Sequence, residues 1–169
     1  ISPLGQKYLG ASNIDLPDDD LQADMYEWAV EFLAAHGYIR YEVANFAKQG
    51  YECRHNLAYW QLQDYIGLGP AAVSCLNNRR TKNEENINSY AARLLSGGLG
   101  YQPEDVEILS LKVRIAEYVF LGLRMAEGID LKEFKQRFNR EIQDIYGPIL
   151  TDYLNRGFLL LENGKIKIN

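Results

Sequence analysis

The residues best suited to chemistry lie together in one short stretch, 52–60, which reads ECRHNLAYW. His55 can ligate iron or exchange a proton near neutral pH, and Arg54 can hold a carboxylate through two parallel hydrogen bonds. Tyr59 and Trp60 can stack their rings on a flat apolar ligand. As a set, these groups suit a planar, acidic, iron-bearing ligand such as a porphyrin, because haem iron is commonly held by His. The structural alternative is a hydrogen-bonded His beside two aromatic core anchors.

Two short apolar segments, 38–44 and 64–68, flank this stretch and are predicted to be strands that hold it as a loop. Binding groups concentrate on loops that a rigid scaffold positions. Glu42 and Asn45 lie at the end of the first strand, where α/β barrels carry their sites. These two polar residues are therefore candidates to line a barrel mouth. The alternative is that Glu42 pairs with Arg40 across an exposed face.

A glycine-rich turn follows the second predicted strand, with Gly67 and Gly69 in the sequence GLGPAA. The turn superficially resembles a dinucleotide fingerprint, but that motif must open a helix, and residues 70–76 do not read as one. The two glycines instead allow the backbone to turn tightly near a ligand or another strand. They join the barrel-mouth candidates.

Hydrophobic periodicity and capping residues predict the other elements. The predicted helices are 17–36, 86–96, 108–124, 130–138 and 141–156. Asn-rich or Asn-Gly turns predict hairpins over 73–83 and 158–168. Residues 1–16 show no strong period and are predicted to be an irregular surface segment.

The glycine-rich segment 97–105 is the predicted boundary between two domains. Residues 1–105 have the succession of helix and strand that is typical of α/β folds. Residues 106–169 are predicted to be helical with a two-stranded wing, which is the outline of a winged-helix module. The predicted fold is therefore an α/β part followed by a helical part.

Composition excludes several classes of protein. The chain is 47% hydrophobic and 24% charged, as globular proteins are, so disorder is not expected. No apolar run approaches the roughly 20 residues of a membrane helix, and the start of the sequence lacks the pattern of a signal peptide. Cys53 and Cys75 fit neither a disulfide framework nor a CxxC metal site. This pattern favours free thiols and a cytoplasmic protein.

Charge bears on possible partners. The net charge of −5 argues against a protein whose whole surface grips nucleic acid. The winged-helix outline raises DNA binding as a third function, but Lys and Arg barely outnumber Asp and Glu from residue 130 onward. A DNA reader should carry a basic stripe, so we do not expect nucleic-acid binding. The open edge of a partial sheet would favour self-association.

Three segments resemble a known family: YEVANFAKQGYECRHNLAYW, DYIGLGPAAVS and FLGLRMAEGIDLKEFKQRF. They are similar to the oxygen-independent coproporphyrinogen III oxidase-like radical SAM proteins, the HemN/HemW family. The likeness is greater to the haem-chaperone (HemW-type) branch than to the true oxidase. It covers nearly the whole chain, thins before Leu16, and corresponds to the C-terminal half of such a protein. The resemblance implies the end of an incomplete (β/α) radical SAM barrel followed by a HemN-type C-terminal domain.

The resemblance also implies ligands and partners. Members of the family bind a [4Fe–4S] cluster and S-adenosylmethionine, and the haem-chaperone branch binds haem at its HNxxYW block. Carried over to this chain, the haem-binding candidates are His55, Asn56, Tyr59 and Trp60. His55 would be the axial ligand of the iron, and the N-terminal radical SAM half of the same protein is the expected partner. The alternative is a true oxidase that converts coproporphyrinogen III to protoporphyrinogen IX by oxidative decarboxylation.

The sequence departs from the family pattern in two places. It lacks the CxxxCxxC motif, which Cys53 and Cys75 cannot replace, and it begins without Met. We therefore expect a fragment that holds no cluster and is inactive alone. Where the family usually reads GxGAGAHS, this chain has Ala71 in place of a Gly and Val73 in place of a His. Any role of that His is therefore absent here.

Overall fold

The computed structural model describes residues 17–169, so the irregular segment predicted for residues 1–16 lies outside the described residues. The helices are α2 (Asp19–Ala35), α3 (Arg54–Trp60), α4 (Ile87–Leu95), α5 (Leu111–Arg124), α6 (Leu131–Phe138) and α7 (Ile142–Asn155), with a 3₁₀ turn at Pro103–Asp105. The strands are β1 (Ile39–Glu42), β2 (Asn45–Ala47), β3 (Val73–Leu76), β4 (Arg79–Lys82), β5 (Glu107–Ile108), β6 (Ile129–Asp130), β7 (Leu159–Glu162) and β8 (Lys165–Ile168).

The strands form three small sheets, ordered β1-β2, β3-β4-β5 and β6-β8-β7. Within residues 17–169, every pair of neighbouring strands is antiparallel. The described chain therefore has the mixed helix and strand content that the sequence predicts. Its sheets are hairpins and short ladders rather than a continuous sheet.

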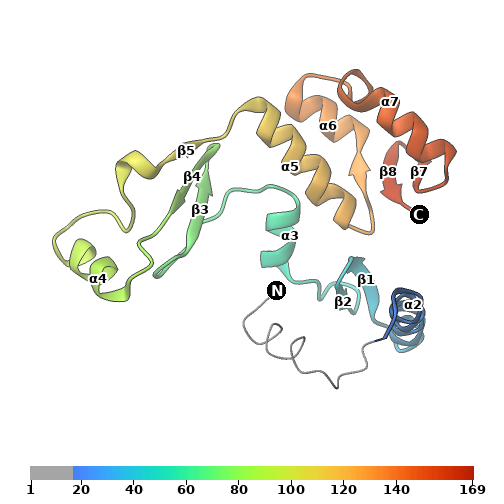
Figure 1. Ribbon diagram of the computed structural model, residues 1–169, viewed down its shortest axis with the longest axis horizontal. Coiled ribbons are helices and arrows are strands. Elements are labelled where there is room, and N and C mark those ends of the chain that lie inside the picture. The colour runs from blue at the N-terminus through green and yellow to red at the C-terminus, as the bar shows by residue number, and fades with distance from the viewer. Residues whose placement is uncertain (1–16) are drawn as a thin grey trace.

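The main hydrophobic core lies in the C-terminal module, residues 109–169, where α5, α6 and α7 pack with the sheet β6-β8-β7 (Figure 1). Its buried apolar side chains are Ile115, Tyr118, Ile129, Phe134, Phe138, Ile142, Leu150, Leu159 and Ile166. The rings of Phe134 and Phe138 lie 5.0 Å apart at the centre of this cluster. Aromatic side chains bury the largest apolar areas, so this module supplies most of the apolar burial of the described chain.

Capping residues fix the ends of elements in this module. Asp130 begins α6, because its Oδ1 accepts hydrogen bonds from the backbone N of Lys132 at 2.8 Å and of Glu133 at 3.0 Å. Asn163 and Gly164 reverse the chain between β7 and β8 with φ of 50° and 76°. Both features agree with the cap and the Asn-Gly turn that the sequence predicts.

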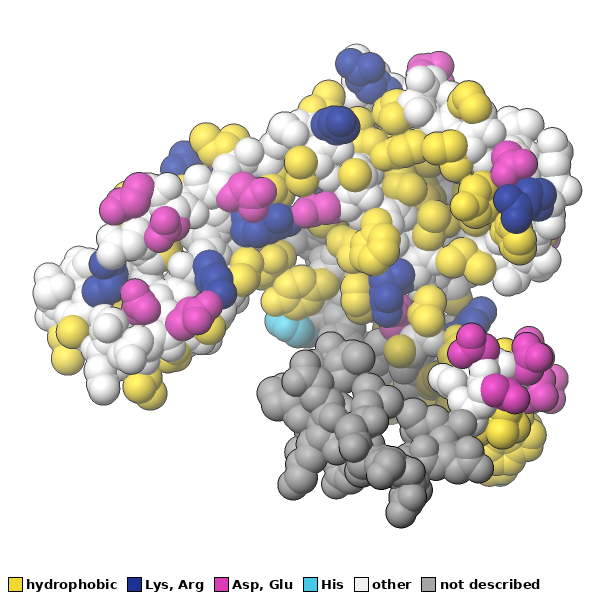
Figure 2. Space-filling view, viewed as in Figure 1, with side chains coloured by type: hydrophobic (Ala, Val, Ile, Leu, Met, Phe, Trp, Pro, Cys, Tyr) yellow, Lys and Arg dark blue, Asp and Glu magenta, His cyan; other side chains and the backbone are white. Residues whose placement is uncertain are grey.

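Helix α2 lies against the β1-β2 hairpin but buries none of its own residues. Tyr26 joins the two, because its Oη donates to the Val43 carbonyl at 2.6 Å and accepts from Arg40 Nη1 at 2.9 Å. The rings of Trp28 and Phe32 stack at 5.0 Å and remain exposed. Hydrophobic side chains accordingly lie open on α2 (Figure 2). This helix has an apolar face that nothing among residues 17–169 covers.

Strands β3, β4 and β5 form an arm with α4 at its tip, which extends away from the C-terminal module (Figure 1). Asn77 and Asn78 make the tight turn between β3 and β4 with φ of 49° and 63°, as predicted. Asn86 begins α4, because its Oδ1 accepts from the backbone N of Asn88 at 3.0 Å and of Ser89 at 3.1 Å.

The prediction of one strand over 38–44 is wrong, because the chain reverses after Glu42 and returns as β2. The carboxylate of Glu42 stabilises this turn. Its Oε2 accepts from the backbone N of Ala44 at 3.0 Å and from Asn45 Nδ2 at 2.6 Å. A turn made by one buried carboxylate leaves no Gly or Pro signal in the sequence.

The strand predicted over 64–68 is also wrong, since only Tyr65 pairs there, in an isolated bridge with Cys75. The stretch 52–60 is not a loop, because most of it forms α3, a helix too short for helical periodicity to reveal. The helix predicted over 108–124 begins at Leu111. Residues 107–108 instead pair with β4 as strand β5.

Candidate functional site

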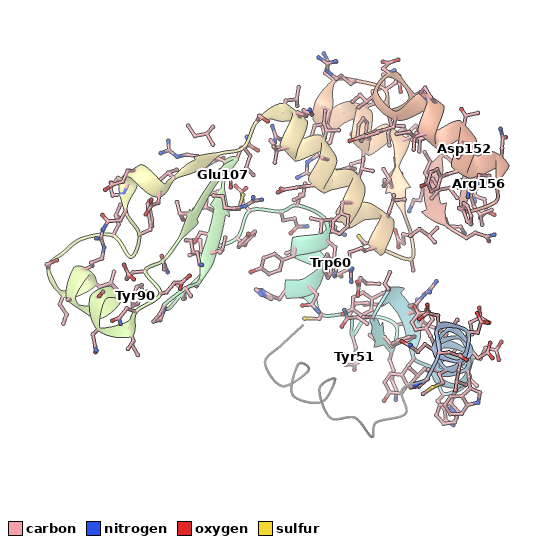
Figure 3. All side chains as sticks on the ribbon, viewed as in Figure 1. Tyr51, Trp60, Tyr90, Glu107, Asp152 and Arg156 are labelled. Carbon is pink, nitrogen blue, oxygen red and sulfur yellow. The ribbon has the colours of Figure 1, made fainter. Side chains whose placement is uncertain are left out.

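Helix α3 positions the residues that the sequence singles out. His55 and Tyr59 lie one helical turn apart, so their side chains share one face. Their ring centroids are 4.8 Å apart in an edge-to-face contact, and the ring of Tyr59 lies 4.4 Å from that of Tyr65. Trp60 ends the helix close to the C-terminal end of α5 (Figure 3). One short helix thus presents an imidazole and two aromatic rings.

A cleft of about 530 Å³ opens between α3, the β3-β4 hairpin and α5. Three of the predicted site residues, Asn56, Tyr59 and Trp60, line it. Its other ring and apolar walls are Leu62, Tyr65, Leu109, Phe120, Leu121 and Phe138. Its other polar lining residues are Gln63, Asp64, Cys75, Asn78, Arg80, Arg114, Glu117 and Arg137. The cleft therefore combines flat apolar walls with cationic groups.

The remaining predicted site residues do not line this cleft. Arg54 and His55 are exposed on the first turn of α3, outside the cleft but beside Tyr59, which does line it. Glu42 and Asn45 bond to each other in the β1-β2 turn. The structure thus brings Tyr59 and Trp60 together on the wall of the cleft and leaves the imidazole of His55 at the rim of the cleft.

Gly67 and Gly69 form a tight backbone turn and do not line the cleft. A Cβ on Gly67 would lie 2.3 Å from the Val73 carbonyl oxygen, and Gly69 has φ of +101°. Asn83 Nδ2 donates to the carbonyls of Gly67 at 3.3 Å and Gly69 at 2.9 Å. These contacts match the prediction of a tight turn against another strand, and they give the glycines no contact with the cleft.

Glu42 is the buried acid of the described chain, with no exposed surface. Besides Ala44 N and Asn45, its carboxylate accepts a hydrogen bond from Arg124 Nη2 at the end of α5. Burial alone would raise the pKa of Glu42, but these three donors outweigh it and hold the pKa below its usual range. The alternative pairing with Arg40 is wrong, because Arg40 donates to Tyr26 instead.

Arg124 connects this acid to the aromatic wall of the cleft. Its guanidinium carbon lies 4.8 Å from the centroid of the Trp60 ring. Its carbonyl accepts from Val43 N at 3.0 Å, which adds a backbone link between α5 and the β1-β2 hairpin. Within residues 17–169, Trp60 Nε1 and Arg124 Nε are buried without a hydrogen-bond acceptor. Arg124 therefore contacts both the buried acid of the β1-β2 hairpin and the ring of Trp60 at the end of α3.

Some of the charged and polar groups that line the cleft are paired within the protein or partly desolvated. Arg80 Nη2 binds both carboxylate oxygens of Glu117, at 2.7 and 2.8 Å, and this contact raises the pKa of Arg80. Burial raises the pKa of the Cys75 thiol and of the Tyr65 hydroxyl. Both groups are therefore held in their neutral forms, and neither is poised to act as a nucleophile or base near neutral pH.

The cysteines of the described chain do not form a cluster site. Cys53 is exposed and Cys75 is half-buried. Residues 17–169 contain no group of three or more His, Cys, Asp or Glu side chains placed to hold a metal ion. A [4Fe–4S] cluster therefore does not fit the donors present in this part.

Over the same residues, 17–169, no helix is long and apolar enough to cross a membrane.

Comparisons with known proteins show which family this chain resembles. Residues 109–169 match the family described as HemN C-terminal domain. Over 151 residues, the chain is 35% identical to the haem chaperone HemW of Lactococcus lactis, covering 89% of this chain and 39% of that protein. It is 32% identical over 146 residues to HemW of Bacillus subtilis, covering 86% of this chain and 38% of that protein. The chain is similar to proteins of the HemN/HemW family over most of its length.

A solved structure agrees with the family at the level of the fold. The coproporphyrinogen III oxidase HemN of Escherichia coli, which is described as a radical SAM enzyme, matches with a TM-score of 0.67 and 17% identity. The match covers 92% of this chain and 39% of that one. This chain thus spans about two fifths of its HemW and HemN relatives. The family resemblance that the sequence segments carry is confirmed.

Sequence reasoning missed the arginines of the cleft. Arg80, Arg114 and Arg137 come from β4, α5 and α6, elements far from the HNxxYW stretch in the chain. Arg124 and Arg137 both lie inside the third segment that resembles the HemN/HemW family, so that segment held a signal for them. Arg80 and Arg114 lie outside all three segments, and their place in the cleft is visible only in the tertiary structure.

Proposed function

We propose that this chain is the C-terminal part of a radical SAM haem-handling protein that acts as a haem chaperone, with haem as its cargo. The observation that supports the proposal is the placement of Tyr59 and Trp60 of the HNxxYW block on the wall of a cleft against α5. Flat rings and apolar walls suit the face of a tetrapyrrole. The relatives are named haem chaperones, which favours this function over the oxidase alternative.

The proposed site uses α3 in two ways. The rings of Tyr59 and Trp60 would stack on the macrocycle, while the exposed imidazole of His55 would offer a nitrogen to the iron at the rim of the cleft. Haem bound there would stay open to a receiving protein, as a chaperone requires. Asn56, which also lines the cleft, would offer its amide as a hydrogen-bond donor to the edge of the ligand.

We also propose the domain assignment that the resemblance implies. Residues 1–105 would be the C-terminal portion of a radical SAM barrel, and residues 106–169 a winged-helix-like domain. The order helix, strand, two helices and hairpin after residue 110, with β6 paired to β8, supports the second assignment. The uncovered apolar face of α2 supports the first, because an N-terminal half would supply its packing surface.

The radical SAM cofactors would belong to that N-terminal half. The cysteines of this chain do not suit a cluster, so the [4Fe–4S] cluster and S-adenosylmethionine would be bound outside the residues described. When bound, they would supply one-electron and radical chemistry. The residues of this chain would hold and orient the porphyrin and carry no step of that chemistry.

Haem titration of the full-length protein tests the proposal. The Soret band and affinity should change in His55→Ala through loss of the iron ligand, and the affinity should fall in Tyr59→Ala through loss of stacking. His36→Ala is the matched control, because His36 lies at the end of α2, where its Nδ1 donates to the Phe32 carbonyl at 2.7 Å. A spectrum and affinity unchanged in both α3 variants would remove this helix from the haem site.

A further inference from the structure

Three arginines line the cleft, and two of them are already satisfied by protein oxygens. Arg80 binds Glu117 through two contacts and also lies 3.2 Å from Glu107. Arg137 donates to the backbone carbonyls of Gln61 at 2.9 Å and Leu62 at 2.5 Å. Both side chains therefore serve to join α3 and the arm to the C-terminal module.

Arg114 differs from these two. It lies half-buried on the first turns of α5, and among residues 17–169 its guanidinium has no carboxylate or carbonyl oxygen within hydrogen-bonding distance. Its observed contact is with the face of Phe138, whose ring centroid lies 5.8 Å from the guanidinium carbon. A guanidinium that stacks on a ring keeps its N–H edge free for a planar anion.

The surroundings of Arg114 favour an anionic partner. Glu117, the acid of α5 that shares the cleft, is bound through both carboxylate oxygens by Arg80, which also pairs with Glu107, and this contact offsets part of its repulsion of a bound carboxylate. The neighbouring walls are apolar, and Tyr65 and Cys75 are desolvated. A charge pair in such a place is screened less than one in open water.

We propose that Arg114 binds a carboxylate on the edge of the flat ligand that stacks on Tyr59 and Trp60. The inference rests on the proposed function, and it adds a recognition rule to it: the cargo must be a planar apolar ring that carries an ionised carboxylate, as a porphyrin propionate does. Arg114 thereby selects the orientation of the ring in the cleft, with its acidic edge toward the start of α5.

Comparison of haem with haem dimethyl ester isolates this contact. The ester keeps the ring and the iron but lacks the negative charges. Wild-type protein should bind haem at least about tenfold more tightly than the ester, as expected for a charge-assisted hydrogen bond. Arg114→Gln should lose that preference by weakening haem alone, and Arg114→Lys should restore part of it. Lys112→Gln, at an exposed position on the same helix, is the matched control and should keep the preference.

The outcomes separate this inference from the proposed function. Retained affinity of Arg114→Gln for the ester would show that the variant folds. A haem-to-ester ratio equal in wild type and Arg114→Gln, or an equal loss for both ligands, would overturn the role of Arg114 while leaving the haem site in place. Failure of the wild-type full-length protein to bind either compound would overturn the proposed function and this inference with it.

Discussion

The guanidinium of Arg124 lies over the ring of Trp60, with 4.8 Å between the guanidinium carbon and the ring centroid. The same guanidinium donates to the fully buried carboxylate of Glu42. Since these residues come from α5, α3 and β1, one cation joins the C-terminal module to the helix that carries the HNxxYW block. The geometry of the cleft wall is therefore coupled to an ion pair outside the cleft.

Replacement of Glu42 by Gln should destabilise the protein by about 2 kcal/mol, because it leaves the Arg124 cation without its buried counter-charge. Urea unfolding at neutral pH measures the loss. In a Trp28→Phe background, the emission of Trp60 reports whether the ring still lies under the guanidinium. Glu162→Gln is the control, since its exposed pair with Lys167 should contribute less than about 0.5 kcal/mol. Equal effects of the two variants would contradict the coupling.

The pH dependence of stability should carry the signature of Glu42. Its pKa is lowered in the folded state, from an ordinary value of 4.5. The unfolded state therefore binds the proton first, and the stabilisation is fully present above about pH 5.5 and is lost as the pH falls through the folded pKa. The free energy of unfolding of wild type should drop faster below pH 4.5 than that of Glu42→Gln. Parallel curves for the two proteins would contradict this assignment.

Ala71 has φ of 60°, a left-handed conformation that an L side chain adopts at a cost. The family pattern GxGAGAHS has Gly at this position. Ala71→Gly should therefore stabilise the protein by about 0.5–1 kcal/mol, after the greater freedom of Gly in the unfolded chain offsets part of the gain. Thermal unfolding measures the change. Ala72→Gly, at a neighbour without positive φ, should instead destabilise it.

Local signals in the sequence predicted much of the fold. Asn77, Asn78 and Asn163 made the hairpin turns predictable because Asn tolerates positive φ. Asp130 made the start of α6 predictable because its carboxylate caps the helix. Helix α3 was missed because it is too short for helical periodicity, and another miss involves a contact between distant residues. The turn after Glu42 depends on Arg124, 82 positions away in the chain, and no local pattern reports such a pair.

The candidate site likewise contains residues that a local sequence signal predicted and residues that only the tertiary structure shows. Asn56, Tyr59 and Trp60 could be predicted from the HNxxYW block, and all three line the cleft. Arg114 could not, since its place in the cleft depends on how α5 packs against α3. The sequence also could not tell that Gly67 and Gly69 pack against β3 and Asn83 rather than a ligand, because glycine suits either role.

Gly67→Ala tests that structural role directly. The added Cβ would lie 2.3 Å from the Val73 carbonyl oxygen, so the backbone of the turn or of β3 must move. The expected loss is about 2–3 kcal/mol, as for other overpacked sites. Gly50→Ala is the matched control, because φ is +83° there but no atom lies within 4 Å of the new Cβ. That variant should lose only about 1 kcal/mol, from backbone strain. Urea unfolding of both variants ranks the losses, and a Gly67→Ala protein as stable as Gly50→Ala would show that β3 does not pack on this glycine.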